Sequence, residues 1–435
     1  MCPKVCESYD WSAERETARA NIIEDTKRER DDRSPFDRDW ARIIHSSAFR
    51  RLQGKTQIFA PATADYLRTR VTHSIEVAQI GRALATRFGV PASLVEAACL
   101  GHDLGHPPFG HTGEHALNSV MQKHGGFEGN AQSFHIATKL EQKHRDYDGL
   151  DLCRGTLLGL IKYPYRRGAG KKYLYEEDAA VYADWLYDGT PYGLLAAAHD
   201  DPPRTIAAQL MDWSDDIAYS VHDLEDGILS GYLQPATWNS ETFLRALHKS
   251  ILEAPIKWKG DPPTEQQVAG YVAPLYDALA RWAPDIPMDV IREISRVYID
   301  RFARACDVEA HGDIETSFDF KLTIPEDFRI ENQVLKSITF EFIIRDPRTV
   351  QIFHKGEQIV LRLFDELYAN ASEDRPDRFL LFPRDARERL AMDRDDQSAL
   401  ARYVCDYIAS MTEGQALRLY ARLFEPFSAT EVPLP

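Results

Sequence analysis

Apolar residues recur at helical spacing along most of the chain, and in the first long stretch this pattern includes a histidine. Between residues 70 and 88, His73 shares one row with Val77, Ile80, Leu84 and Phe88. Such a row is the buried stripe of an amphipathic helix. The spacing therefore predicts a helix whose imidazole points inward.

Two further helical patterns carry acidic or imidazole side chains. After Pro91 one row holds Leu94, Ala98 and His102, and the adjacent row holds Cys99 and Asp103. This pattern predicts a mostly buried helix that ends at the His-Asp pair. Farther along, an apolar stripe is flanked by a polar row at i, i+4 and i+8 that consists of Asp215, Tyr219 and Asp223. The apolar residues of that stripe are Leu210, Ile217, Val221, Leu224 and Ile228.

The remaining pattern predicts a mostly all-α fold with small β elements. Apolar residues alternate with polar ones near residues 315–325, where the period of two indicates a half-buried strand. Helical spacing returns after Pro325. We predict a charged N-terminal arm over residues 1–33, a helical core over 34–250 and a mostly helical C-terminal region over 251–435. The charges between residues 14 and 33 favour an exposed arm or helix.

Composition excludes several classes of protein. The 435 residues include 52 basic and 68 acidic side chains, a net charge of −16 that disfavours sequence-independent nucleic-acid binding by the whole surface. The six cysteines are scattered without a CxxC pair, so neither a disulfide framework nor a zinc ribbon is indicated. The N-terminus lacks an apolar signal region, and no apolar run approaches the roughly 18 residues of a membrane helix. We expect a soluble cytoplasmic protein with no membrane contact.

The segment from His102 to His115 places four histidines and two carboxylates in 14 residues. A divalent cation prefers imidazole nitrogens and carboxylate oxygens that converge from different elements. His73 and Asp215 are the further donors that the helical rows direct inward, so the predicted metal ligands are His73, His102, Asp103 and Asp215. Each residue alone also fits another role, since a histidine on an apolar face is more often a hydrogen-bonded core residue and Asp215 could cap a helix or face solvent.

Five separated blocks resemble, in order, the motifs of the dGTPase-type deoxynucleoside triphosphate triphosphohydrolases, which are HD-domain phosphohydrolases. They lie at residues 38–57, 102–114, 127–133, 162–164 and 215–220, and from Gly231 onward the resemblance is loose. The resemblance implies an HD-domain helical bundle with a helical C-terminal extension, over residues 251–435, that contributes to the base pocket and to oligomer contacts. It implies hydrolysis of a dNTP, either dGTP or several dNTPs, to a deoxynucleoside and inorganic triphosphate.

The same resemblance implies the cofactor and the reacting groups. The cofactor is a divalent metal, with Mg²⁺ or Mn²⁺ favoured and Fe²⁺, Co²⁺, Ni²⁺ or Zn²⁺ also compatible with a His₂Asp₂ set. His111, paired with Glu114, is implied as the acid or base at the reacting centre, because an imidazole titrates near neutral pH and a carboxylate stabilises its cation. His106 is implied to contact phosphate or to order water.

Substrate contacts are implied residue by residue. Arg70, Lys162, Tyr163 and Lys172 resemble the polyphosphate contacts of the family, and Arg70 can present a guanidinium fork to phosphate oxygens. The sugar or base contacts implied by the motifs are Gln57, Asn130, Tyr219 and Asp223. Gly129 departs from the pattern, since many relatives carry a histidine there, and any auxiliary acid-base role of that position is therefore missing.

Two other functions stay open from the sequence. One is an HD phosphohydrolase that acts on another nucleotide or on single-stranded DNA ends, and the other is a regulatory protein that senses nucleotides. The expected partners are a dNTP substrate, further copies of the chain in a homo-oligomer such as a hexamer, and a second nucleotide as allosteric activator. Single-stranded DNA is a weaker expectation.

Overall fold

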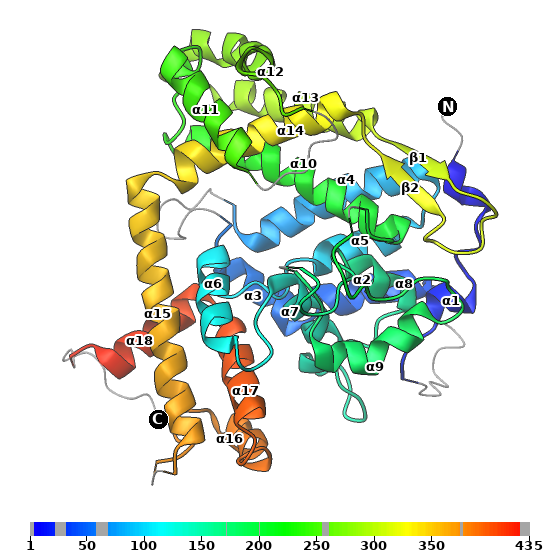
Figure 1. Ribbon diagram of the computed structural model, residues 1–435, viewed down its shortest axis with the longest axis vertical. Helices are drawn as coiled ribbons and strands as arrows, with labels where there is room; N and C mark the ends of the chain where they lie inside the picture. Colours follow the sequence, from blue (N-terminus) through cyan, green and yellow to red (C-terminus); the bar gives the residue numbers. More distant parts are fainter. Residues whose placement is uncertain are drawn as a thin grey trace.

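The computed structural model describes residues 4–21, 32–57, 68–170, 172–199, 201–254, 261–374 and 377–426. These residues form a mostly helical protein with one small sheet, as the sequence predicts (Figure 1). The N-terminal half contains η1 (Val5–Ser8), α1 (Glu14–Thr17), α2 (Pro35–Ile44), α3 (Ser47–Arg51), η3 (Leu52–Gly54), α4 (Arg70–Phe88), α5 (Ala92–Gly101), α6 (Gly110–Met121), α7 (Gly129–His135), the π-helical turn η4 (Ile136–Leu140), α8 (Arg154–Leu160), α9 (Glu176–Tyr187) and α10 (Ile206–Leu229).

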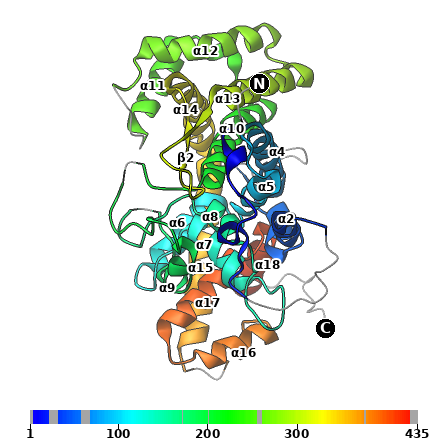
Figure 2. The same ribbon diagram turned by 90° about the vertical axis from the view of Figure 1, so that its right-hand side faces the viewer.

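The C-terminal half continues with helices and the sheet. Its elements are η5 (Pro235–Thr237), α11 (Glu241–Glu253), α12 (Glu265–Leu279), η6 (Ala280–Trp282), α13 (Met288–Ala305), β1 (Asp307–Ala310), β2 (Phe320–Thr323), α14 (Glu326–Thr339), the π-helical turn η7 (Phe340–Ile344), α15 (Pro347–Ser372), α16 (Arg384–Met392), α17 (Gln397–Ala409) and α18 (Glu413–Phe424). Figure 2 shows α15 to α18 extending away from α11 to α13, toward the opposite end of the molecule.

The three helices expected from the apolar rows are α4, α5 and α10, and they pack against one another. The apolar row of α4 is fully buried, and His73 within it is 1% exposed. α4 ends at Gly89, whose left-handed backbone (φ 82°) is the usual helix stop. These predictions are confirmed, and they place the candidate ligands between three buried helices.

Strands β1 and β2 pair in antiparallel register, with Asp307 opposite Thr323 and Ala310 opposite Phe320. The strand expected near 315–325 is thereby confirmed. The sheet is tied to the start of α10, because the Gln209 amide donates to the Phe320 carbonyl and accepts from the Leu322 N–H. The sheet therefore holds the helix that carries Asp215.

The described residues 4–21 of the N-terminal segment range from exposed to buried, and some of their charged side chains pair with the core. Glu16 is 2% exposed and accepts a 2.7 Å bond from the Tyr9 hydroxyl. Arg19 forms a 2.7 Å ion pair with Asp39 on α2. Buried partners for these charges hold the segment against the core, although its composition resembles that of a solvated arm. Residues 22–31 of the expected arm lie outside the described residues, and the domain boundaries stay predictions.

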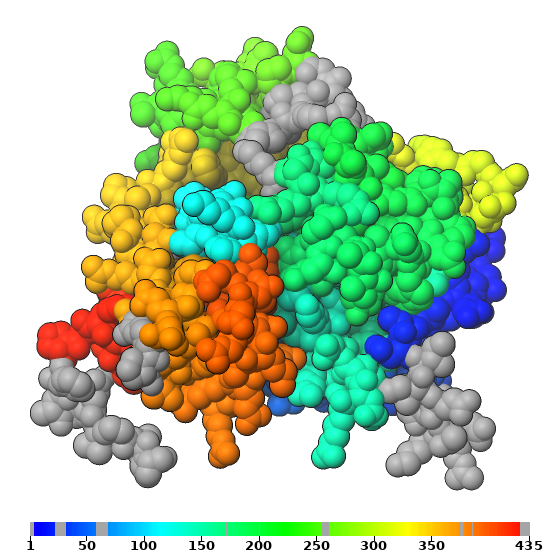
Figure 3. Space-filling view, turned by 60° about the horizontal axis from the view of Figure 1, so that its bottom comes forward, coloured from blue at the N-terminus to red at the C-terminus, as the bar shows by residue number. Residues whose placement is uncertain are grey.

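Buried apolar side chains form two large clusters. The first includes α2, α4, α5, α8 and α10 together with α11 to α14. The second joins α15, α17 and the start of α18 to Ala116, Leu117 and Met121 of α6. In Figure 3 the cyan helix α6 accordingly lies against the gold and orange C-terminal helices. α6 thus belongs to the C-terminal core although its sequence position is in the N-terminal half.

A buried charged cluster links α7, α9 and α17. His135 is 1% exposed and lies 2.9 Å from Asp178 and 3.6 Å from Asp406. Burial lowers the pKa of His135, but the bonds to Asp178 and Asp406 outweigh burial and raise the pKa to about 10. The imidazole is therefore a cation at neutral pH. Among the described residues, no helix combines the length and the apolar character that crossing a membrane requires.

Candidate active site

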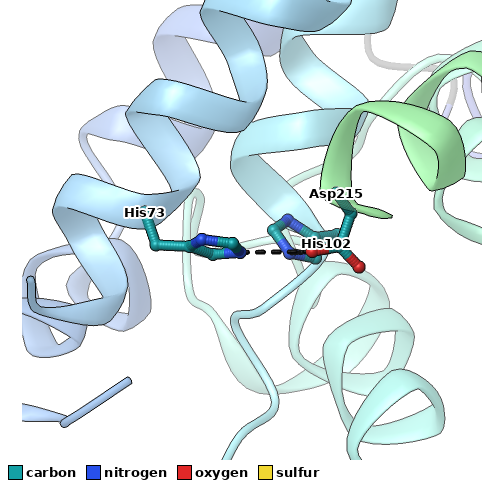
Figure 4. A group of neighbouring side chains, drawn as sticks. All are labelled: His73, His102 and Asp215. Atoms are coloured by element: carbon teal, nitrogen blue, oxygen red, sulfur yellow. Dashed lines mark hydrogen bonds and ion pairs between the residues drawn. The ribbon is translucent and has the colours of Figure 1, made fainter. Parts of the chain in front are cut away.

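Three of the four predicted metal ligands, His73, His102 and Asp215, converge at one point between α4, α5 and α10. Asp215 Oδ1 lies 3.2 Å from His73 Nε2 and 3.5 Å from His102 Nε2 (Figure 4). His102 Nε2 also lies 3.4 Å from Asp103 Oδ1. Ligand atoms bound to one cation at about 2.1 Å are separated from each other by roughly 3.0–3.4 Å. The spacing of His73, His102 and Asp215 therefore fits a single divalent cation, and Asp103 lies beside His102 at the edge of this set.

The orientation of His102 supports the same interpretation. His102 Nδ1 lies 2.6 Å from the Cys99 carbonyl oxygen, to which it donates, so the lone pair is left on Nε2. Nε2 is buried and has no hydrogen-bond partner among the described residues. An orphaned imidazole nitrogen between two carboxylates is the arrangement that a bound cation would satisfy. Burial lowers the pKa of His102, but Asp103 and Asp215 raise it to about 9, so the two carboxylates attract positive charge to Nε2, either a proton or, in its place, a metal cation.

Asp103 is held from two sides. Arg70 donates to its Oδ2 at 2.7 Å, and His106 Nδ1 lies 2.9 Å from its Oδ1. Burial raises the pKa of Asp103, but His106, His102 and Arg70 outweigh it, so the pKa lies well below its usual range. Asp103 is therefore an anion whose two oxygens are fixed in direction.

Lys162 contacts the metal-ligand set directly, which sequence reasoning did not anticipate. Its Nζ lies 3.1 Å from Asp215 Oδ2 and 2.6 Å from Asp212 Oδ1. Arg204 pairs with the second oxygen of Asp212 at 2.6 Å. Asp212 was not among the predicted site residues, although its position three residues before Asp215 puts both carboxylates on one helical face. This chain of charges fixes the ammonium group of Lys162 at the edge of the ligand set.

A second group of side chains lies beside the metal ligands. His111 Nδ1 is 3.0 Å from Glu114 Oε2, and the Gly129 N–H donates to Glu114 Oε1 at 3.0 Å. Burial raises the pKa of Glu114, but the bond from His111, the charge of His106 and the Gly129 N–H lower it to about 2. Glu114 is therefore a carboxylate that orients His111. The imidazole rings of His106 and His111 are 5.5 Å apart.

Both groups open into one cavity of about 390 Å³. Thirteen of the fifteen predicted site residues line it, namely Gln57, Arg70, His73, His102, Asp103, His106, His111, Glu114, Asn130, Lys162, Lys172, Asp215 and Tyr219. Tyr163 and Asp223 do not line it. Tyr163 lies behind Lys172, whose Nζ is 3.3 Å from the hydroxyl and 4.5 Å from the ring centre. Asp223 is 1% exposed, and burial raises its pKa well above the usual range.

The opposite wall of the cavity comes from the C-terminal half. Phe340, Ile344 and Phe353 give it an apolar surface, and Lys336 adds a cation that pairs with Asp216 at 2.5 Å. Sequence reasoning assigned no role to these four wall residues, because helical spacing marks them only as amphipathic. The cavity thus has a metal-binding and cationic side and an apolar side, with Tyr219 from α10 also in its lining.

Family models match two parts of the chain. The HD domain matches residues 70–219, which hold all four candidate ligands, and a phosphohydrolase-associated domain matches residues 322–422. A deoxyguanosinetriphosphate triphosphohydrolase-like protein of Shewanella baltica (strain OS185) is 35% identical over 94% of this chain and 96% of its own length. The chain belongs to this family of HD-domain phosphohydrolases.

Other members of the deoxyguanosinetriphosphate triphosphohydrolase-like family show similar coverage. The proteins of Shewanella pealeana and Shewanella sediminis are 34% and 33% identical over 92% and 95% of this chain. The alignments cover 94% and 97% of those relatives, so the resemblance extends through the C-terminal region, where the motifs alone were loose. HD-domain membership and the clustered His and Asp side chains together imply a divalent metal site.

Proposed function

We propose that this HD-domain phosphohydrolase is a metal-dependent dNTP triphosphohydrolase that releases a deoxynucleoside and inorganic triphosphate. The observation that carries the proposal is the single cavity in which the His₂Asp₂ set, the His111–Glu114 pair and several cations face one another. Its volume of about 390 Å³ is in the range of small-molecule sites. The relatives are named deoxyguanosinetriphosphate triphosphohydrolase-like proteins, which supports the proposal.

The cations of the cavity fit a polyphosphate. Arg70 offers a guanidinium beside the metal ligands, while Lys162 and Lys172 line the same side. Burial lowers the pKa of Lys162, but Asp212 and Tyr163 and then Asp215 raise it well above the usual range, so Lys162 stays charged. Fixed cations in a partly water-excluded cavity stabilise a chain of phosphates far better than cations in bulk solvent do.

His73, His102, Asp103 and Asp215 would hold a divalent cation, which would supply charge neutralisation at the α-phosphate and lower the pKa of a bound water. In the proposed reaction a water oxygen bonds to the α-phosphorus and the bond from that phosphorus to the 5′ oxygen breaks. The departing 5′ oxygen takes up a proton and the water gives one up. His111, oriented by Glu114, serves either as the donor to the 5′ oxygen or as the acceptor from the water.

The side chain of Tyr219 supports the deoxy preference. It lies on α10, one turn after Asp215, and lines the cavity. A tyrosine packed against the sugar leaves no room for a 2′ hydroxyl. The apolar wall at Phe340, Ile344 and Phe353 provides a surface that suits the flat face of a base.

The test is to incubate the purified protein with each dNTP and each NTP in the presence of Mg²⁺ or Mn²⁺. Anion-exchange chromatography should show deoxynucleoside and triphosphate in equal amounts. In ¹⁸O-labelled water the label should enter the triphosphate, because attack takes place at phosphorus. Monophosphate with pyrophosphate, or label in the deoxynucleoside, would contradict the proposal. His102→Ala, which lacks one metal ligand, is the control for contaminating phosphatases.

The same assay addresses the two alternative functions. Cleavage of another nucleotide or of single-stranded DNA ends, without cleavage of dNTPs, would favour a different HD phosphohydrolase. Tight dNTP binding without turnover would favour a nucleotide sensor. The homo-oligomer, the activating second nucleotide and the binding of single-stranded DNA stay predictions. Light scattering tests the first, and added dNTP or oligodeoxynucleotide in the turnover assay tests the other two.

A further inference from the structure

The two halves of the candidate active site are built on different hydrophobic cores. His73, His102 and Asp215 come from α4, the end of α5 and α10, whose apolar side chains form the first core. His111 and Glu114 lie on the first turns of α6, whose buried residues pack with α15 and α17 in the second core. Since the two groups must face the same substrate, the joint between the cores sets their separation.

That joint is the turn at Phe109 and Gly110, just before His111. Phe109 has a left-handed backbone (φ 66°, ψ 23°), and Gly110 follows with φ 56°. Left-handed backbone is unfavourable for a residue with a side chain and persists only where the surroundings enforce it. The surroundings of Phe109 therefore decide the direction in which α6 and His111 point.

A carboxylate of the C-terminal region holds the backbone of this turn. Glu413, the first residue of α18, is 4% exposed and accepts a 3.3 Å bond from the Phe109 N–H. The same oxygen accepts a 3.0 Å bond from the Thr56 N–H and a bond from the Thr56 hydroxyl. Thr56 precedes Gln57 in the cavity lining. One carboxylate thus joins α18 to two segments of the active site.

The ring of Phe109 is held from the other side by α15. A Cβ at Gly356, within α15, would lie 2.8 Å from Phe109 Cγ and 2.9 Å from Phe109 Cβ. Only a glycine allows the ring to pack this closely against the helix. Nearby, Lys55 is 2% exposed and its ammonium group donates to the His106 carbonyl and, at 2.8 Å, to the Ala409 carbonyl. These contacts bind the segment 106–109 to the C-terminal core at three separate points.

We propose that Glu413 is a positioning residue that fixes the His111–Glu114 pair relative to the metal ligands. It acts through the Phe109 turn and touches neither substrate nor metal. Glu413 belongs to the phosphohydrolase-associated region 322–422, so this region then helps to position the catalytic residues in addition to packing beside the HD domain. The inference rests on the proposed function, because it assigns to His111 a role in that reaction.

The test compares kcat, KM and metal affinity in matched variants. Glu413→Ala should lower kcat by about 100-fold, the usual consequence of a shift of about 1 Å at a reacting group. Glu413→Gln keeps an oxygen that accepts a hydrogen bond from the Phe109 N–H, so its kcat should be roughly tenfold higher than that of Glu413→Ala. Binding of Mn²⁺, measured by calorimetry, should stay within about threefold of wild type, because the ligands belong to the other core. Gly356→Ala should reproduce the loss of kcat by displacing the Phe109 ring.

Two controls separate positioning from general loss of stability. Glu141 is 9% exposed, and its carboxylate likewise accepts two backbone N–H groups, those of Ser47 at 3.1 Å and Ala48 at 2.6 Å. Glu141→Ala removes a comparable buried carboxylate from the first core and should leave kcat per folded molecule unchanged. Gly270→Ala on α12, where a Cβ meets nothing within 4 Å, controls for Gly356→Ala.

Hydrogen exchange gives a readout that does not depend on activity. Residues 107–115 should exchange faster in Glu413→Ala and Gly356→Ala than in wild type or the two controls. If the wild-type protein cleaves no dNTP, the proposed function fails and this exchange pattern alone judges the positioning role. A folded Glu413→Ala variant with near-wild-type kcat, or with metal affinity reduced as much as kcat, would overturn the inference. Should Glu413→Ala not fold, Glu413→Gln and Gly356→Ala decide in the same way.

Discussion

Replacing Gly105 by alanine should destabilise the protein strongly, because the segment that carries Asp103 and His106 passes directly over α7. A Cβ at Gly105 would lie 2.2 Å from the Gly129 carbonyl oxygen and 2.2 Å from the Ser133 backbone nitrogen. Both atoms are backbone atoms of a buried helix, so neither can rotate aside. The Gly105 N–H also donates to the Ser133 hydroxyl at 2.9 Å, which fixes the separation of the two segments.

The magnitude follows from opposing contributions. Ordinary contacts between heavy atoms lie at about 3.5–4.0 Å, so each contact would be short by more than about 1 Å. Overpacking of a well-ordered core typically costs about 1–3 kcal/mol, and immobile backbone neighbours place this substitution at about 3 kcal/mol or above. Alanine restricts the unfolded chain, which offsets less than about 1 kcal/mol. The expected net loss is about 2 kcal/mol or more, together with displacement of Asp103 and His106.

Urea unfolding followed by circular dichroism measures the loss, and Mn²⁺ calorimetry measures the displacement of the ligands. Gly270→Ala is the matched control, because the same substitution in an open position of α12 should stabilise the helix by up to about 1 kcal/mol. A Gly105→Ala protein whose stability is within about 1 kcal/mol of wild type, with unchanged metal affinity, would refute the steric reasoning.

Three other outcomes follow from the site and from the buried cluster. His102→Ala should abolish Mn²⁺ binding and turnover together, whereas His111→Ala should still bind Mn²⁺ and lose about 10²–10⁴-fold in kcat. Calorimetry measures the metal binding and steady-state kinetics measures kcat. A His111→Ala variant with near-wild-type kcat would exclude an acid-base role for His111. Tyr219→Ala should raise the rate with NTPs relative to dNTPs, and an unchanged ratio would argue against steric exclusion. His135, with its pKa raised from 6.5 to about 10, contributes stability that is complete below about pH 6.5 and is lost as pH rises through about 10. Unfolding free energy in urea should therefore fall by up to about 1.4 kcal/mol per pH unit across that window in wild type, and a His135→Gln variant with the same slope would contradict this assignment.

The helices that carry the metal ligands could be predicted because their signal is local. The row of His73 and its apolar neighbours has the period of a buried helix face, and the structure buries it as expected. Asp215 was placed beside an apolar stripe in the same way, and its Oδ1 lies within 3.5 Å of both ligand histidines. The fold class and the convergence of His73, His102 and Asp215 therefore followed from periodicity and from the family motifs.

The contacts that join the two cores could not be predicted, because they link residues far apart in the sequence. Glu413 is 304 positions from Phe109 and 357 from Thr56, and its own surroundings in the sequence resemble an ordinary helix start. From the sequence, Gly356 is only a helix-destabilising residue within α15, and the structure shows that the Phe109 ring packs against it. Periodicity shows which face of a helix is buried and leaves open what is buried against it.

The charge distribution of the protein bears on the kind of anion that the cavity accepts. The net charge of −16 repels polyanions at the surface, but salt screens this repulsion beyond about 8 Å at physiological ionic strength. Inside the cavity Arg70, Lys162, Lys172 and Lys336 act at contact distance. Burial lowers the pKa of Lys172, but Tyr163 together with Glu128 and Glu114 raises it above the usual value, so this cation also persists at neutral pH. Positive charge that is concentrated within one cavity of an acidic protein favours a short polyphosphate that enters the cavity over a nucleic acid that runs along the surface.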